Sequence, residues 1–236
     1  MVEQGLAESR ERAKRLVMAG QVYLETGGRR ELLDKPGRML PAGAALSLAE
    51  PERFVSRGAY KLLSALESFK LDVSGAVALD VGASTGGFTD CLLQHGAARV
   101  YAVDVGKSQL HEKLRADPRV VALEGVNFRL APPDLIPGKV DICVADVSFI
   151  SLTKVLPVIK GFVKPGGKIV ALVKPQFELG PGMTDKGVVR DEGLRMQAVR
   201  MVEEAARALQ MEPAGFVPAG VKGPKGNQEY LLLILA

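Results

Sequence analysis

The fold is decided by the stretch Ala76-Val77-Ala78-Leu79-Asp80-Val81-Gly82-Ala83-Ser84-Thr85-Gly86-Gly87-Phe88-Thr89-Asp90. An apolar run ends at an acidic residue, and a loop of glycines and small residues follows before helix-compatible residues begin. This order predicts a strand, a glycine loop and a helix, the opening of a Rossmann-like sheet in which glycine lets a nucleotide approach the backbone closely. A tight strand-to-helix turn without a ligand is the alternative that this stretch alone leaves open.

The glycine spacing narrows the class of ligand. A dinucleotide fingerprint G-x-G-x-x-G that starts at Gly82 requires glycine at position 84, where this chain has Ser84. Read from Asp80, the loop is D-x-G-x-x-x-G, which resembles the first loop of methyltransferases that use S-adenosylmethionine (SAM). That resemblance implies a set of SAM-contacting residues in the loop: Asp80, Gly82, Ala83, Ser84, Gly86 and Gly87.

Two residues further along the chain extend this predicted cofactor site. Asp104 ends the second predicted strand, where a carboxylate can accept both ribose hydroxyls of a nucleotide-like cofactor. An NAD enzyme would use the same acid, so Asp104 does not discriminate between NAD and SAM. The alternative is that Asp104 is an ordinary acidic residue at the end of a strand, without a ligand. Asn127 follows the third predicted strand and, by analogy of position, is expected on the adenine side of SAM.

Strand and helix patterns alternate after residue 77. Strands are predicted at 77–80, 99–104, 119–123, 140–146 and 168–173, and helices near 85–95, 107–116, 152–163 and 191–209. One further helix, near 56–69, precedes the first of these strands. This alternation predicts a parallel sheet with helices on both faces. Two more strands, near 213–218 and 229–235, have no helix between them and must be antiparallel. A mostly parallel sheet of seven strands with a reversed last strand is the methyltransferase arrangement, and it disfavours a dinucleotide dehydrogenase.

Composition excludes several other classes of protein. The chain has 236 residues, 47% hydrophobic, with a net charge of +4, as expected of a globular α/β protein with at most a weak preference for anionic partners. Its 2 cysteines cannot form a disulfide framework, so a reducing cytoplasm is the expected location. No apolar stretch is long enough to span a bilayer. His95 and His111 lack partners at ligand spacing, so no metal is expected.

Residues 1–54 form a predicted first unit, and residues 55–60 a linker to a second unit at 61–236. Ser9 is placed to cap a helix that runs to about Ala19. The basic residues of this helix could simply form a solvated face. However, Ala7–Val22 resembles the small α+β RNA-binding (S-four-type, or αL) domain. This chain lacks that domain's usual first basic turn. The resemblance implies phosphate contacts from Arg10, Arg12, Lys14 and Arg15.

Polar residues terminate the apolar strands at one predicted edge. Asp146 closes the fourth strand and Lys174 the fifth, while Glu229 opens the reversed strand at the same edge. Lys61 lies in the helix before the first strand and can fold over the site. Any one of these residues could simply be a polar, solvent-facing end of a strand. That alternative does not explain why four such residues converge on the same edge of the sheet.

This set, together with Ser56–Leu62, Asp80–Asp90 and Leu172–Glu178, resembles the TlyA family of FtsJ-like ribose methyltransferases over essentially the whole chain. The family methylates the 2′-hydroxyl of cytidine in 16S or 23S ribosomal RNA. The resemblance implies a catalytic tetrad of Lys61, Asp146, Lys174 and Glu229, with Asp146 also at the cofactor.

The residue chemistry supports this role. A free lysine, with a pKa of about 10.4, is protonated at neutral pH and cannot act as a base. The second lysine and the sulfonium of SAM favour a neutral Lys174, whereas Asp146 and Glu229 oppose that change and are better interpreted as orienting groups. Lys174 is the expected base, and Lys61 is expected to hold the hydroxyl.

Two further functions remain as alternatives. One is an RNA-binding ribosome-assembly factor that holds SAM without turnover, although such a factor has no use for paired lysines and acids. The other is a membrane-lytic hemolysin, which requires a signal, a spanning helix or a strongly amphipathic basic helix; the sequence shows only a short basic helix.

Overall fold

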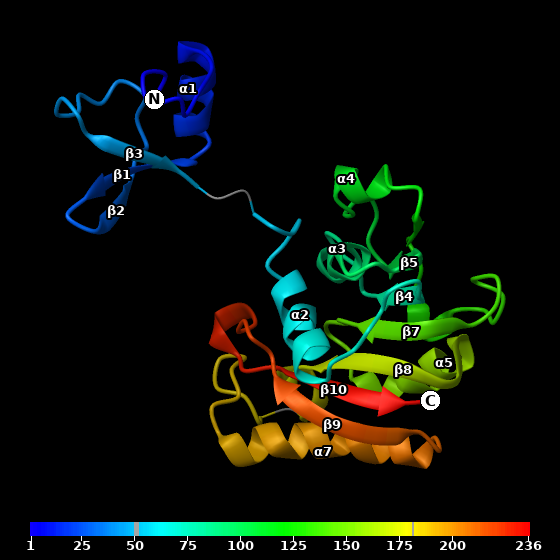
Figure 1. Cartoon of the computed structure of the whole chain (residues 1–236). Coiled ribbons are helices and arrows are strands. Elements are labelled where there is room, and N and C mark those ends of the chain that lie inside the picture. Colours follow the sequence, from blue (N-terminus) through cyan, green and yellow to red (C-terminus); the bar gives the residue numbers. More distant parts are fainter. Residues whose placement is uncertain (50–51, 181) are drawn as a thin grey trace. The chain divides into compact units, whose positions relative to one another are not determined.

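The computed structural model describes residues 1–49, 52–180 and 182–236. Glu50 and Pro51, which precede the predicted linker at 55–60, lie outside the described residues, as does Pro181. The chain divides into two compact units, Met1–Arg53 and Phe54–Ala236, each with its own elements (Figure 1).

The first unit combines one helix with a small sheet. Helix α1 (Arg10–Met18) begins at Ser9, whose side chain accepts a hydrogen bond from the Arg12 backbone N–H, so the predicted cap is confirmed. Strands β1 (Val22–Thr26), β2 (Arg29–Leu32) and β3 (Ala45–Leu48) form an antiparallel sheet in the order β2-β1-β3. The basic side chains predicted to meet RNA are all exposed on or beside α1: Arg10, Arg12, Lys14 and Arg15.

The second unit is built on a seven-stranded sheet in the order β6-β5-β4-β7-β8-β10-β9. Its strands are β4 (Val77–Val81), β5 (Arg99–Asp104), β6 (Val120–Glu124), β7 (Val140–Ala145), β8 (Val163–Val173), β9 (Glu212–Pro218) and β10 (Tyr230–Leu235). β4 to β8 pair in parallel, and β10 is antiparallel to both β8 and β9. The prediction of a mostly parallel sheet with a reversed last strand is confirmed.

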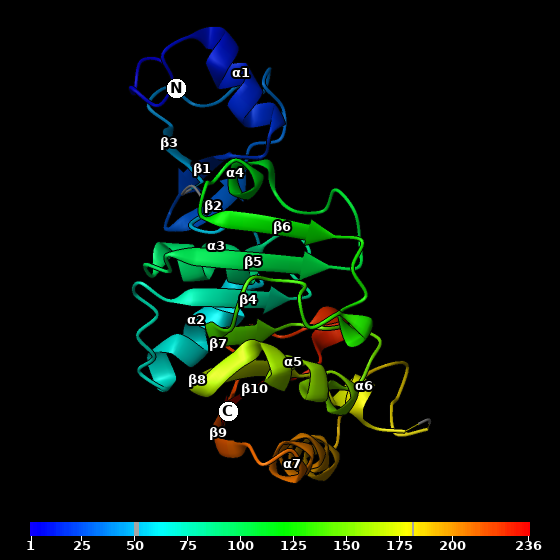
Figure 2. The same cartoon turned by 90° about the vertical axis from the view of Figure 1, so that its right-hand side faces the viewer.

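Helices cover both faces of this sheet because its strands are apolar on both sides. On one face, α2 (Ala59–Ser68) and α3 (Gly87–Gln94) pack with Ala78 and Val100; on the other, α5 (Leu156–Phe162) and α7 (Glu192–Ala208) pack with Leu79 (Figure 2). Consecutive residues of β4 thus serve opposite layers of the core. The short elements are α4 (Glu112–Arg115), α6 (Pro175–Glu178), η1 (Phe128–Leu130), η2 (Leu152–Lys154) and η3 (Pro224–Gly226).

Several predicted boundaries differ from the structure. The helix expected at 107–116 is limited to α4, because Ser108 has a left-handed backbone with φ of 56°, and the helix expected from residue 56 begins at Ala59. The helix expected from residue 85 begins at Gly87, because Gly86 has a left-handed backbone with φ of 94°. The helix expected at 152–163 is split into η2 and α5, with a proline in the first turn of α5, where a missing N–H does no harm. Strand β8 begins five residues before its predicted start at 168, because Val163 already pairs with Val140 of β7.

The parallel strands bring their carboxyl ends to one edge of the sheet. In Figure 2 the arrows of β4, β5 and β6 point the same way, and β10 begins where β8 ends. The loops after β4, β5, β7 and β8 therefore meet at this edge, where open α/β sheets bind ligands. Among the described residues, no helix has both the length and the apolar character needed to cross a membrane.

Candidate active site

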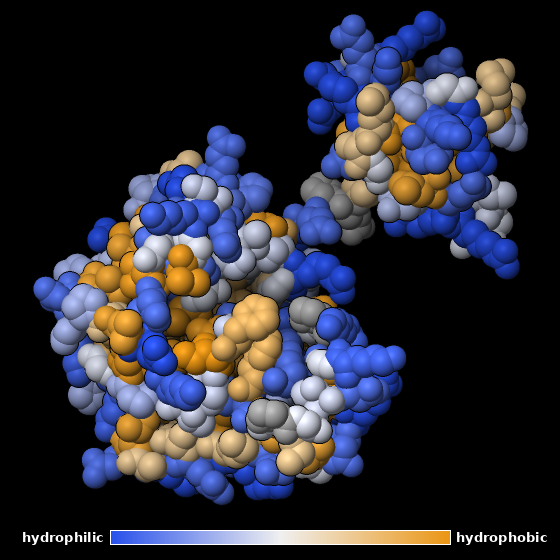
Figure 3. All heavy atoms as spheres, turned by 180° about the vertical axis from the view of Figure 1, so that it is seen from behind, coloured by the Kyte–Doolittle hydropathy of each residue, from blue (hydrophilic) through white to orange (hydrophobic). Residues whose placement is uncertain are grey.

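A cavity of about 530 Å³ lies at the carboxyl ends of β4, β5 and β7. Figure 3 shows a hollow in the larger unit with apolar side chains gathered around it. The lining combines apolar residues such as Val105, Val126 and Phe128 with polar groups at the strand ends. Of the predicted cofactor residues, the lining includes Gly82, Ser84, Asp104, Asn127 and Asp146.

Asp104 joins the loops on either side of the cavity. Its Oδ2 accepts a hydrogen bond from the Ser84 backbone N–H at 2.8 Å, and its Oδ1 accepts one from the Gly106 N–H at 2.7 Å. A carboxylate has about four acceptor positions, so capacity remains for two ligand hydroxyls. Asp104 thus fixes the loop after β4 and still presents acceptors to the cavity.

Gly82 allows the ends of β4 and β7 to approach. Its φ is +85°, and a Cβ at this position would lie 2.6 Å from the backbone oxygen of Asp146. Any side chain would push these two strand ends apart and close part of the cavity. The glycine is therefore required by the contact with the neighbouring strand, as well as by the turn.

Asp80 and Ala83 lie outside the lining of the cavity. Asp80 is fully buried on β4, and its Oδ2 accepts a hydrogen bond from the Thr89 hydroxyl at 2.6 Å. Its Oδ1 has no hydrogen-bond partner among the described residues. Burial raises the pKa of Asp80 to about 7, more than the Thr89 hydrogen bond lowers it. In this structure Asp80 joins β4 to helix α3 through Thr89.

Gly86 and Gly87 also lie outside the lining, and each makes a close packing contact. A Cβ on Gly86 would lie 2.2 Å from Leu114 Cδ1, and one on Gly87 would lie 2.9 Å from the Ala59 backbone nitrogen at the start of α2. These glycines let the loop and helix α3 pack tightly against their neighbours. The sequence spacing does not distinguish this packing role from ligand contact.

The four residues of the predicted tetrad form two buried ion pairs. Lys61 Nζ on α2 lies 2.6 Å from Glu229 Oε2, just before β10. Lys174 Nζ, just after β8, lies 2.7 Å from Asp146 Oδ1, just after β7. Both lysines and Glu229 are buried, so each charge depends on its partner for compensation.

The two pairs are neighbours at the edge between β8 and β10. Val173 pairs with Tyr230, so Lys174 and Glu229 are the next residues on these two strands. Gln176 Nε2 donates a long hydrogen bond of 3.4 Å to the other oxygen of Glu229, and Lys174 Nζ donates to Ser148 Oγ at 2.7 Å. Sequence reasoning missed Ser148 and Gln176, because an isolated serine or glutamine beside a strand carries no spacing signal.

Two aromatic rings lie at the mouth of the site. Phe149 is 91% exposed and lines the cavity, and its ring centroid is 5.1 Å from that of Phe177. Lys174 Nζ lies 5.8 Å from the centroid of Phe177. The exposed ring of Phe149 offers a flat surface on which a nucleic-acid base can stack. The sequence analysis did not select either phenylalanine.

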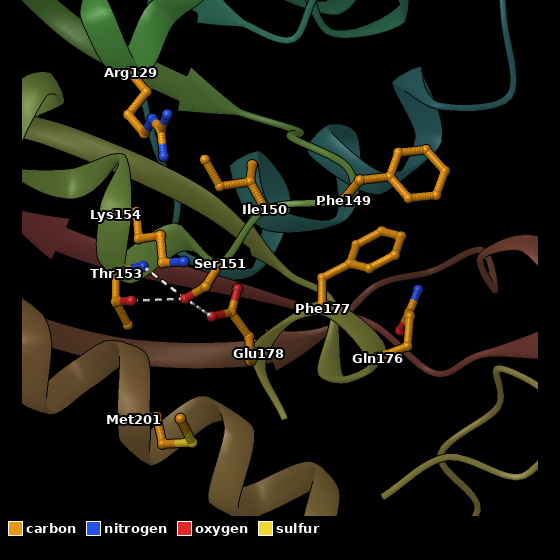
Figure 4. A pocket seen from close by; sticks show the side chains of 10 residues that line it. All are labelled: Arg129, Phe149, Ile150, Ser151, Thr153, Lys154, Gln176, Phe177, Glu178 and Met201. Carbon is orange, nitrogen blue, oxygen red and sulfur yellow. Dashed lines mark hydrogen bonds between the residues drawn. The ribbon is translucent and has the colours of Figure 1, made fainter. Parts of the chain in front are cut away.

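A second cavity, of about 670 Å³, adjoins the first (Figure 4). Arg129, Phe149 and Ile150 line both cavities, and Lys154 brings a further cation to the second. The edge of the sheet thus offers two adjoining cavities, of which the second is the more basic.

The first cavity fits SAM. Its volume lies within the range of small-molecule sites, about 300–1,000 Å³. Asp104 supplies acceptors for ribose hydroxyls, and apolar side chains surround a region suited to an adenine ring. Asp146 lines the cavity beside Lys174, so a methyl donor bound there would lie close to the lysine–carboxylate pair.

Comparison with known proteins agrees with this geometry. The model of the FtsJ-like methyltransferase family matches residues 54–234. The chain belongs to that family. This methyltransferase is also 47% identical to the 16S/23S rRNA (cytidine-2′-O)-methyltransferase TlyA of Mycobacterium tuberculosis, over 98% of this chain and 86% of that protein. These matches place it in the TlyA branch of the FtsJ-like enzymes, and SAM is its cofactor.

Two more relatives cover nearly the whole methyltransferase chain. YqxC of Bacillus subtilis is 46% identical over 98% of this chain and 82% of its own length. A solved structure from Streptococcus thermophilus has a TM-score of 0.77 and 45% identity, and the match covers 99% of this chain and 85% of that one. Similarity thus extends through both units.

Proposed function

We propose that this protein transfers a methyl group from SAM to the ribose 2′-hydroxyl of cytidine in ribosomal RNA, of the small subunit, the large subunit or both. The observation that carries the proposal is the pair of buried lysine–carboxylate contacts, Lys61–Glu229 and Lys174–Asp146, beside a cavity that fits SAM. A protein that only binds RNA has no need for buried, paired lysines at this edge, because desolvating them is unfavourable.

Lys174 is the proposed general base. Bound SAM supplies a methyl group on a positively charged sulfur. The two lysines and two carboxylates have balanced charges, so a further positive charge bound in the adjoining cavity would favour the neutral form of a neighbouring lysine such as Lys174. The neutral amine then accepts the proton of the 2′-hydroxyl, while Asp146 and Ser148 hold the amine in place at 2.7 Å each.

Lys61 is the proposed holder of the hydroxyl. Glu229 accepts a hydrogen bond from its ammonium at 2.6 Å and orients it. An ammonium at this position donates to the ribose oxygen and stabilises the negative charge that develops when the proton leaves. Holding the hydroxyl in line with the methyl group provides much of the remaining acceleration.

RNA contacts are proposed for both units. In the first unit, an S-four-type RNA-binding domain is supported by the exposed cations of α1, which supply affinity for phosphates without reading sequence: Arg10, Arg12, Lys14 and Arg15. In the second unit, Phe149 is the proposed stacking surface for the base of the target nucleotide. A ribosomal substrate places the protein in the cytoplasm.

The test is transfer of radiolabelled methyl from SAM to purified ribosomal subunits and to free rRNA. Lys174→Ala should lower kcat by about 100-fold or more, which is the usual contribution of a general base, with SAM affinity retained. Lys164→Ala is the matched control: Lys164 lies near the start of β8, the strand that Lys174 follows, and pairs with Asp141 at 2.6 Å, away from the carboxyl edge. It should leave kcat unchanged.

The outcomes separate the proposed enzyme from the alternative. Label in a cytidine ribose, lost in Lys174→Ala and kept in Lys164→Ala, supports the proposal. If the wild type binds SAM and labels no RNA, the ribosome-assembly factor is the better interpretation. If Lys174→Ala retains turnover, Lys174 is not the base.

A further inference from the structure

Glu178 is a buried carboxylate that the proposed chemistry does not use. It ends α6, four residues after Lys174, and is 7% exposed. Its Oε2 accepts a hydrogen bond from Ser151 Oγ at 2.5 Å, and its Oε1 accepts one from the Leu152 backbone N–H at 3.0 Å. Figure 4 shows Glu178 pointing toward Ser151 at the wall of the second cavity. One side chain thus joins the segment after β8 to the segment after β7.

Both segments carry parts of the proposed active site. The segment after β7 supplies Asp146 and Ser148, and both contact Lys174 Nζ at 2.7 Å. The segment after β8 begins with Lys174 and continues through Phe177, whose ring meets that of Phe149. Contacts therefore join the two segments near the cavity, and Glu178 joins them a second time at their far ends.

The segment after β7 needs such support because its backbone is strained. Phe149 has a φ of 63°, in the left-handed region that a bulky side chain disfavours, while its ring is 91% exposed. An exposed ring cannot by itself hold the backbone in this conformation. The fixed points on either side are the Ser148 contact with Lys174 and the Ser151–Leu152 contacts with Glu178.

We propose that Glu178 is a positioning residue for methyl transfer: it fixes the segment 147–152 so that Ser148 meets Lys174 and Phe149 faces the target base. The inference rests on the proposed function, in which Lys174 and Phe149 meet the nucleotide. A purely structural role would make Glu178 a cap for η2 and α5, with no effect on the reacting groups beyond the stability of the fold.

The experiment compares Glu178→Ala, Glu178→Gln and the control Asp141→Ala. The glutamine amide can accept from Leu152 N–H and donate to Ser151 Oγ, so both connections survive. Asp141 also accepts from one backbone N–H, that of Val77, and one side chain, but at the start of β7, away from the carboxyl edge. Hydrogen–deuterium exchange of residues 147–153 is measured together with kcat and with the KM values for SAM and RNA.

Glu178→Ala should speed exchange of residues 147–153 about ten-fold or more and lower kcat at saturating SAM and RNA about ten-fold or more, because small displacements of reacting groups are costly. Glu178→Gln should stay within about threefold of wild type in both measurements, and Asp141→Ala should change neither.

Unchanged exchange in Glu178→Ala overturns the inference, whatever the activity. Faster exchange with unchanged kcat also overturns it. Faster exchange in a protein whose wild type labels no RNA refutes the proposed function while the connection through Glu178 stands.

Discussion

Replacing Asp80 with asparagine should stabilise the methyltransferase unit above pH 7 and leave its stability nearly unchanged near pH 4. Asp80 is fully buried on β4, and burial raises its pKa from 3.8 to about 7. The asparagine oxygen can still accept the hydrogen bond from Thr89. Its amide leaves one polar group unpaired, as the protonated carboxyl does, so the two side chains differ chiefly in their ability to ionise.

The magnitude follows from the two pKa values. Between pH 4 and pH 7 the folded protein keeps a proton on Asp80 that the unfolded chain has lost. The free energy of unfolding therefore falls as pH rises through this window and is constant above it. At about 1.36 kcal/mol per pKa unit, the difference between 3.8 and about 7 corresponds to at most about 4 kcal/mol. Asp80→Asn should gain up to that amount relative to wild type above pH 7.

Urea denaturation, followed by far-UV circular dichroism between pH 4.5 and 8.5, measures this difference. Asp141→Asn is a control of opposite sign, because the Lys164 ammonium and the Val77 N–H hold the pKa of Asp141 below its usual range. That variant should be less stable than wild type by a constant amount across this pH range, because the stability that a depressed carboxyl pKa contributes is lost only as pH falls below about 4. A difference between Asp80→Asn and wild type that does not change with pH would refute the reasoning.

Three further substitutions test separate parts of the molecule. Phe149→Ala should raise the KM for RNA about ten-fold with SAM affinity unchanged, since stacking on one base is worth about 1–3 kcal/mol; an unchanged KM excludes the stacking role. Gly82→Ala should weaken SAM binding in calorimetry at least about ten-fold, because its Cβ would lie 2.6 Å from the Asp146 backbone oxygen; wild-type affinity would contradict the close approach. Ser9→Ala removes the acceptor for Arg12 N–H and should destabilise the first unit by about 1 kcal/mol in thermal unfolding, whereas an unchanged transition would show that the cap is dispensable.

Local pattern was sufficient to predict the architecture of the second unit. The run Ala76–Asp90 marks the first strand, its glycine loop and α3, and the absence of a helix between β9 and β10 forces the last strand to reverse. These features depend on residues close in sequence, through periodicity, glycine and the length of connections. The carboxyl-edge positions of Asp146 and Lys174 follow from the same reasoning, because parallel strands end at a common edge.

The partners within the site depend on strand order and packing. Lys61 meets Glu229 across 168 residues, and Glu178 meets Leu152 across 26, only because β8 lies between β7 and β10 and α2 packs above them. The same packing buries the acidic residue Asp80 and exposes the apolar residue Phe149, the reverse of what their side chains alone predict. Sequence alone determined which chemical groups reach the carboxyl edge. Only the tertiary structure decided which of them touch, which are buried and which face an incoming RNA. Burial and contact arise between segments that are far apart in the sequence, and the number of residues between two segments does not determine their distance in space.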